Sequence, residues 1–250
     1  MSRISIMHLL KLVFRSCLFL AATVVYMINR LQNTEHIFIR AEHQPLILFI
    51  VWAVFVVEMI LRFFSSSFES MGCQKQFKRN FQPKENAIHT KTLNRGIGWV
   101  ILFWIVLNGG IGALYYAGCI DEGILVLISL FYSVCDMICI LFFCPFQTWM
   151  MKNKCCTSCR IYNWDYAMMF TPLIFVENIF AWSILFFAVV LLVRWEITAY
   201  IHPKRFSEET NACLSCAHCE EKLCHHKKQL RHFWAANKKR FYPLGNKKEE

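Results

Sequence analysis

Residues 123–143 read GILVLISLFYSVCDMICILFF, and Asp136 is the only charged residue among them. An α-helix needs about 20 apolar residues to cross the hydrocarbon core of a bilayer. Four further stretches reach that length with few charges: 9–28, 45–64, 97–117 and 172–193. The sequence therefore predicts an all-α fold, a polytopic integral membrane helical bundle of about five transmembrane helices.

The overall composition agrees with a membrane location. Of the 250 residues, 56% are hydrophobic and only 18% are charged, whereas soluble domains average about 25% charged residues. The net charge of +10 lies mostly outside the apolar stretches. On a membrane protein, such an excess of basic residues indicates contact with anionic lipids and charges that set the orientation of the helices. We therefore expect the lipid bilayer as a partner, and no nucleic acid.

Two regions follow from this pattern. Residues 1–195 are predicted to form the transmembrane domain, and 196–250 a basic tail rich in Cys and His. The chain has no Gly-rich dinucleotide fingerprint, no P-loop and no nucleophile elbow. If the protein is an enzyme, a membrane oxidoreductase subunit is the class that fits.

The charges of the connecting segments predict an orientation. Segments 1–15, 65–96 and 145–171 together hold twelve Lys and Arg residues, whereas 31–44 and 118–122 hold only Arg40. Short cytoplasmic loops are enriched in Lys and Arg. We expect a multi-pass protein of the cell membrane with a cytoplasmic N-terminus, whose first apolar stretch is a retained anchor.

The side of the tail stays open. Five crossings place the tail outside, although 194–250 carries twelve Lys and Arg residues. Only Arg194, Lys204 and Arg205 lie within the roughly 20 residues where charge sets orientation. The alternative is a cytoplasmic tail, with the partly apolar stretch from Trp164 to Phe175 acting as a re-entrant segment.

The tail contains the clearest motif for metal binding, Cys-x2-Cys-x2-Cys-x4-Cys followed by two histidines: Cys213, Cys216, Cys219, Cys224, His225 and His226. Thiolates are soft ligands for zinc, copper(I) and iron–sulfur clusters. The start resembles the bacterial ferredoxin run, which continues Cys-x3-Cys-Pro; here the last gap is x4 and His225 replaces Pro. We favour an iron–sulfur cluster. The alternatives are structural zinc, with these thiolates or with His218 and His225, and no metal.

A second cysteine group precedes the last apolar stretch. Cys155, Cys156 and Cys159 include a Cys-x2-Cys spacing, which is typical of a dithiol redox pair or half of a metal site. They could also be acylated or free thiols. Five crossings would separate this group from the tail cluster, whereas a shared side would allow both to serve one redox relay.

Three acidic residues in or near the apolar stretches form a candidate proton or ion site: Asp136, Glu58 and Glu177. A carboxylate at the bilayer centre costs at least about 2.5 kcal/mol, so Asp136 should be protonated, paired or facing a wet cavity. Glu58 lies four residues before Arg62, and a helical ion pair between them is the simplest account.

We interpret the other features of these apolar stretches first as packing features. We expect five cysteines to act as small hydrophobic residues: Cys17, Cys119, Cys135, Cys139 and Cys144. A metal site on Cys135 and Cys139 would lack further ligands. Gly109 and Ala113 are separated as in helix-packing motifs.

The leading hypothesis is membrane-associated electron transfer or redox chemistry. The four tail cysteines would ligate an iron–sulfur cluster, and the second cysteine group would form another thiol or metal centre. The partner would be a redox protein or a lipid-soluble carrier. The alternatives are an ion-coupled transporter using the three acidic residues, and a membrane scaffold with a structural zinc tail.

Overall fold

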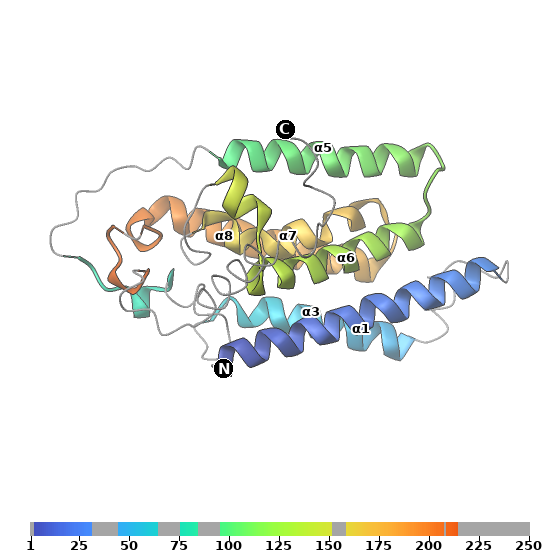
Figure 1. Ribbon diagram of the computed structural model, residues 1–250, viewed down its shortest axis with the longest axis horizontal. Helices are drawn as coiled ribbons and strands as arrows, with labels where there is room; N and C mark the ends of the chain where they lie inside the picture. The colour runs from blue at the N-terminus through green and yellow to red at the C-terminus, as the bar shows by residue number, and fades with distance from the viewer. Residues whose placement is uncertain are drawn as a thin grey trace, which may run out of the picture.

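The computed structural model in Figure 1 is helical throughout the residues it describes, which are 3–31, 45–64, 76–84, 96–151, 159–207 and 209–214. Five apolar helices make up most of it: α1 (Arg3–Leu31), α3 (Pro45–Leu61), α5 (Ile97–Tyr116), α6 (Glu122–Leu141) and α8 (Ile179–Ile201). No strand occurs in these ranges. The predicted all-α fold class is therefore confirmed.

Four of these helices, α1, α5, α6 and α8, are long and apolar enough to cross a membrane. The fifth, α3, has 17 residues, which is about 26 Å at 1.5 Å per residue and close to the thickness of the hydrocarbon core. Large apolar side chains are exposed on the outer faces, as at Phe186 (64%) and Ile105 (63%). Lipid would cover such faces in a membrane protein.

Contacts near the two ends of the helices show in which direction each helix runs. Arg15 of α1 contacts Asp136 near the end of α6, and Tyr26 of α1 donates to Asp121, the N-cap of α6. Hence α1 and α6 are antiparallel. Trp52 of α3 contacts Ser183 of α8, and Phe63, just after α3, contacts Arg194 of α8, so these two helices run in the same direction.

Between α6 and α8 the chain crosses the bundle once more as a broken helix. This broken segment, Arg160–Phe175, consists of η4 (Arg160–Trp164), α7 (Asp165–Phe170) and η5 (Thr171–Phe175). It runs parallel to α5, with Trp104 donating to Thr171 and Gly112 facing the Phe175 ring. Two 3₁₀ turns and one α-helix of these lengths rise about 29 Å. Placed end to end, these three elements would be about as long as a transmembrane helix.

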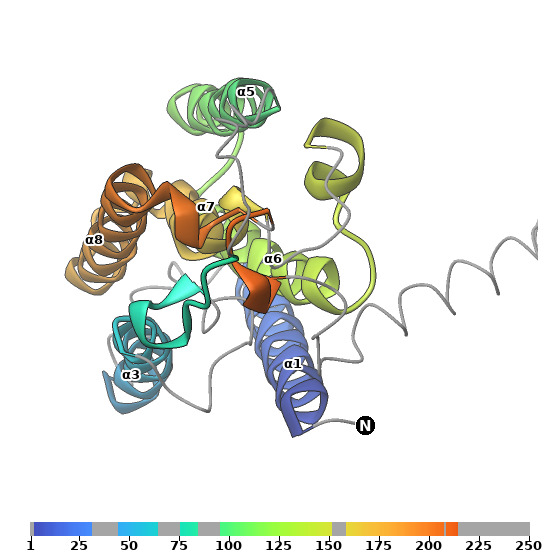
Figure 2. The same ribbon diagram turned by 90° about the vertical axis from the view of Figure 1, so that its left-hand side faces the viewer.

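Viewed along the bundle, α7 lies near the centre, among α8, α3 and α6 (Figure 2). Buried side chains from these elements form the main core, including Tyr166, Phe170 and Phe55. The Phe55 and Phe170 rings meet edge to face at a centroid distance of 5.2 Å. The interior position of the broken segment explains how its irregular backbone is accommodated, because protein rather than lipid surrounds it.

The extra traverse returns the chain to the end of the bundle where it began (Figure 1). The start of the tail pairs there with the segment after α3: Pro83 and Asn211 form a bridge, and Ala212 N–H donates to the Gln82 carbonyl. The five-crossing prediction, which separates the tail from the N-terminus, thus does not describe this arrangement. The stretch from Trp164 to Phe175, which the alternative takes as re-entrant, lies in the broken segment and crosses the bundle instead.

The boundaries of the last span also differ from the prediction of 172–193. Helix α8 begins at Ile179, because Asn178 caps it by accepting a hydrogen bond from Phe180 N–H at 2.8 Å. Asn is a preferred N-cap, and Pro172 is instead accommodated in the first turn of η5. Pro45 does begin α3, as expected.

Candidate functional site

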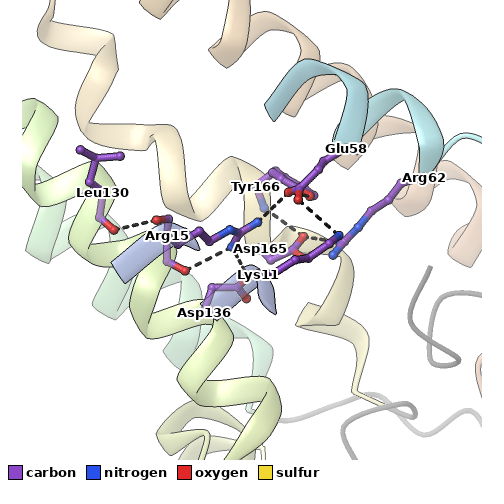
Figure 3. A network of polar contacts seen from close by, with 9 residues as sticks. Lys11, Arg15, Glu58, Arg62, Leu130, Asp136, Asp165 and Tyr166 are labelled. Atoms are coloured by element: carbon purple, nitrogen blue, oxygen red, sulfur yellow. Dashed lines mark hydrogen bonds and ion pairs between the residues drawn. The ribbon is translucent and has the colours of Figure 1, made fainter. Parts of the chain in front are cut away.

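Arg15 occupies the interior of the bundle, where its guanidinium binds two acidic side chains (Figure 3). The side chain is 2% exposed. It donates to Glu58 of α3 at 2.9 Å, to Asp136 of α6 at 3.1 Å and to the Ser133 carbonyl at 3.1 Å. A buried charge is tolerated when it is paired and hydrogen-bonded in this way.

Aromatic and basic groups complete the surroundings of Glu58. Tyr166 of α7 donates its hydroxyl to Glu58 at 2.9 Å, and the Lys11 ammonium lies 3.4 Å from the same carboxylate. The Arg15 guanidinium also lies over the Phe55 and Tyr166 rings, 5.6 and 5.9 Å from their centroids. These cation–π contacts add to the pairing of a desolvated cation.

A second ion pair lies beside the first. Arg62, which follows α3, binds Asp165 at 2.8 Å and stacks 4.6 Å from the centroid of Tyr166. We call the seven residues the ion-pair network: Lys11, Arg15, Glu58, Arg62, Asp136, Asp165 and Tyr166. Its three basic and three acidic groups balance in charge. The predicted helical pair of Glu58 with Arg62 is replaced by pairing across helices, because α1 and α7 bring opposite charges to both.

Sequence reasoning missed Arg15, which it counted among the charges that set orientation. The signal that could have found it is spacing: His8, Lys11 and Arg15 recur every three or four residues on one face of α1. His8 is only 6% exposed, and neither ring nitrogen has a hydrogen-bond partner among the described residues. A polar face on an apolar helix indicates a buried network.

A cleft of about 290 Å³ opens beside the network. Its walls come from α5, α6, the turn at 144–147 and the chain from Cys159 to Met169, and they are mostly apolar and aromatic. Two acidic residues of the network, Asp136 and Asp165, are among the residues that line the cleft. Asp136 is therefore paired, which is one of the outcomes expected for it, and it also borders this mostly apolar cleft.

Four cysteines also line the cleft: Cys135, Cys139, Cys144 and Cys159. None of them forms a disulfide. Gln147 N–H donates to the Cys144 sulfur at 3.4 Å. Three of the five cysteines expected to act as small hydrophobic residues, Cys135, Cys139 and Cys144, therefore border one cleft.

One member of each cysteine group predicted to be functional, Cys213 and Cys159, lies at the same end of the bundle. The Cys213 thiol donates to the Asn80 carbonyl at 3.0 Å, and Gln76 is bound by Asn163 at 2.7 Å. Asn163 lies shortly after Cys159, in η4. Segment 76–84 thus links Cys213 and Cys159.

The remaining members of both groups lie outside the described residues: Cys155, Cys156, Cys216, Cys219 and Cys224. Within the described ranges, no group of three or more His, Cys, Asp or Glu side chains is arranged to hold a metal ion.

Glu177 does not join the other two predicted acids. It immediately precedes Asn178, the N-cap of α8, and its electrostatic neighbour is Tyr115, in the last turn of α5. That is the end of the bundle opposite to Arg62 and Asp165. The structure therefore brings Glu58 and Asp136 into one network and separates Glu177 from it.

The glycine-rich part of α5 packs differently from expectation. A Cβ atom at Gly109 would meet nothing within 4 Å, whereas one at Gly112 would overlap the Phe175 ring. Within α5, Gly112 rather than Gly109 is therefore the glycine that permits close approach.

Comparison with known protein families, with curated proteins and with solved structures finds no match to this chain. Functional inference consequently rests on the cysteine groups, the ion-pair network and the cleft.

Proposed function

We propose that this is a membrane redox protein in which Cys213, Cys216, Cys219 and Cys224 ligate a metal centre, with an iron–sulfur cluster as the favoured group. Electron transfer to or from a membrane-associated partner would be its activity. One observation carries the proposal: the start of the tail and the segment of the second cysteine group lie at the same end of the bundle, joined through residues 76–84.

The donor set fits such a centre. Four thiolates within a short stretch suit iron–sulfur ligation or zinc. The first of them is held in place, because Asn211 is fully buried and accepts from Cys213 N–H at 3.1 Å. Fixed ligand positions are what a preorganised metal site requires. Ligation would remove the thiol proton that Cys213 now donates to Asn80.

The shared end also fits a cytoplasmic location for both cysteine groups. Segment 65–96, the bases of segment 145–160 and the basic tail would then all face the cytoplasm, in agreement with the positive-inside rule. Five crossings would place the basic tail outside the cell, against that rule, and a cytoplasmic tail removes this conflict. A reducing cytosol would keep the ligand thiols available for metal binding.

Metal analysis tests this proposal. Protein purified without oxygen should contain iron and labile sulfide and show broad visible absorption that bleaches on reduction. The variant Cys216→Ser should lose the iron, whereas Cys119→Ser, at an exposed cysteine after α5, should retain it. Stoichiometric zinc without iron would contradict the iron–sulfur assignment.

A second candidate is ion-coupled transport, with the tail as a zinc-stabilised regulator. The observation that favours it is the double position of Asp136, bound to Arg15 and in contact with the cleft. Intramembrane acids commonly mark proton or ion pathways. In proteoliposomes, Asp136→Asn should abolish a proton-coupled flux that Cys216→Ser leaves intact. Unchanged flux in Asp136→Asn would exclude this candidate.

A further inference from the structure

Two basic turns lie close together at the end of the bundle where the tail begins, which is the end nearest the viewer in Figure 2. The first is η1 (Lys78–Asn80), and the second is η6 (Pro203–Arg205), which follows α8. The chain after η1 pairs with the chain after η6 through the bridge of Pro83 with Asn211. We call the four bases of these turns the basic cluster: Lys78, Arg79, Lys204 and Arg205.

Both turns are fixed to α8 by aromatic packing on one ring. Phe77 precedes η1 and Phe206 follows η6, and each packs edge to face on Trp195 of α8, at centroid distances of 5.2 and 6.2 Å. Trp195 is buried. The two turns are thus attached to the same part of the core, although more than 120 residues separate them in the sequence.

Two buried polar side chains hold the backbone of η6 in place. The Thr210 hydroxyl donates to the Lys204 carbonyl at 2.6 Å, and the Asn211 amide donates to the Arg205 carbonyl at 2.9 Å. The Asn211 side chain also accepts from Cys213 N–H. The second basic turn and the first cysteine of the tail are therefore held by the same residue.

The basic cluster carries an excess of positive charge. Three of its side chains are exposed and the fourth, Arg205, is half-buried. Within the part of the chain that the structure describes, no ion pair involves any of the four. Segments 76–84 and 202–214 together hold five Lys and Arg residues but only two acids. Such a surface is complementary to a phosphate group, which both Lys and Arg bind well.

The length of α8 places the basic cluster at the level of lipid headgroups. The helix has 23 residues and is therefore about 34 Å long, slightly longer than the hydrocarbon core of about 30 Å. Its last turn exposes Tyr200 and Ile201, and Tyr is enriched at the membrane–water interface. Lys204 and Arg205 follow directly after this turn, where the phosphates of the bilayer lie.

We propose that the basic cluster is a binding site for the headgroup of an anionic phospholipid. Side chains of the two turns would pair with the phosphate, and the acyl chains would lie along the exposed apolar side chains of the last turns of α8. Clusters of bases next to a spanning helix are typical of anionic-lipid sites. The site goes beyond the redox function proposed above and does not depend on a metal. Bound lipid would hold Cys213, and with it the start of the tail, at the membrane surface.

The test uses the full-length protein purified in detergent, and its probes are phosphatidylglycerol and phosphatidylcholine with identical acyl chains. Native mass spectrometry counts the lipids bound during a titration. The wild type should bind phosphatidylglycerol more tightly, because the choline group of the other lipid neutralises the phosphate. Inorganic phosphate should not displace the lipid, because it has no acyl chain to contact α8. Equal affinity for the two lipids, or displacement by inorganic phosphate, would overturn the assignment to an anionic lipid.

Single variants, one from each turn, test the basic cluster. Lys78→Gln and Lys204→Gln should each weaken phosphatidylglycerol binding about fivefold, which is the effect expected for one base near a membrane surface. Arg30→Gln is the matched control, because Arg30 is also an exposed base in the last turn of an apolar helix but lies at the opposite end of the bundle. An equal loss in Arg30→Gln would show that binding follows total charge, and would overturn the site.

Photo-crosslinking locates the lipid on the unaltered protein. Phosphatidylglycerol with a diazirine near the top of one acyl chain should label the last turn of α8, around Tyr200. Labelling confined to other helices would overturn the location.

The metal centre is tested separately from this site. Cys216→Ser should lose the iron and keep the preference for phosphatidylglycerol. Failure of the iron–sulfur assignment and failure of the lipid site are therefore distinguishable.

Discussion

The Arg15 guanidinium lies between Glu58 and Asp136 in the bundle interior, and the stability of the bundle should depend on this pairing. Removing one partner from a buried ion pair leaves an uncompensated charge and costs about 3–5 kcal/mol. We expect Arg15→Met to lower the melting temperature of the detergent-solubilised protein strongly. Arg30→Met, on the exposed last turn of the same helix, serves as the control.

A triple variant separates charge from packing. Combining Arg15→Met with Glu58→Gln and Asp136→Asn removes the unpaired carboxylates as well, and it should recover part of the lost stability. Replacing a whole buried ion cluster with neutral groups is often tolerated. A melting temperature for Arg15→Met equal to that of the wild type would show that the ion-pair network does not stabilise the fold.

Tyr166 allows a finer test of the same network. Tyr166→Phe keeps the ring that packs against Arg15 and Arg62 but removes the hydroxyl that donates to Glu58. Hydrogen bonds to charged groups contribute about 1.5–3 kcal/mol. The variant should unfold at a lower temperature, measured by circular dichroism. Tyr200→Phe, at a side chain 86% exposed, should not; equal melting temperatures for both variants would contradict this role of the hydroxyl.

At the scale of single residues, the sequence could identify charged residues within apolar stretches but not their interaction partners. Asp136 was identifiable as a charge within an apolar stretch, and Glu58 likewise. Arg15 was not, because a base near the N-terminus also fits a flanking orientation signal.

At the scale of elements, the packing of α5 against the broken segment depends on Gly112. A methyl group there would force the Phe175 ring to move, and overpacking costs about 1–3 kcal/mol. Alanine is also a better helix former than glycine by about 1 kcal/mol. Gly112→Ala should therefore be less stable than Gly109→Ala, in which only the propensity gain acts. Thermal unfolding of both measures the difference, and equal stability would contradict the contact.

Apolar length predicted most elements well, because burial in lipid needs a continuous run of apolar residues. Helices α1, α3, α5 and α6 lie where the pattern placed them. The broken segment has too few apolar residues in sequence to be recognised as a span. It lies in the interior of the bundle, where protein rather than lipid surrounds it. Because it includes the first residues of the predicted last span, helix α8 begins later than predicted.

At the scale of the whole molecule, the broken segment adds a further traverse of the bundle. It returns the chain to the end of the bundle that holds the N-terminus. In the membrane orientation proposed above, this arrangement agrees with the charges of the connecting segments. The sequence left the side of the tail open, because five apolar stretches predict a tail outside the cell whereas the tail charges favour the cytoplasm.

Cysteine labelling in intact cells tests this arrangement most directly. Single-cysteine proteins retaining Cys119, Cys156 or Cys216 are treated with a membrane-impermeant maleimide before and after permeabilisation. Cys119 is exposed and lies between α5 and α6, at the opposite end of the bundle from the described start of the tail. The arrangement predicts labelling of Cys119 in intact cells, and labelling of Cys156 and Cys216 only after permeabilisation. Labelling of Cys216 together with Cys119 in intact cells would contradict it.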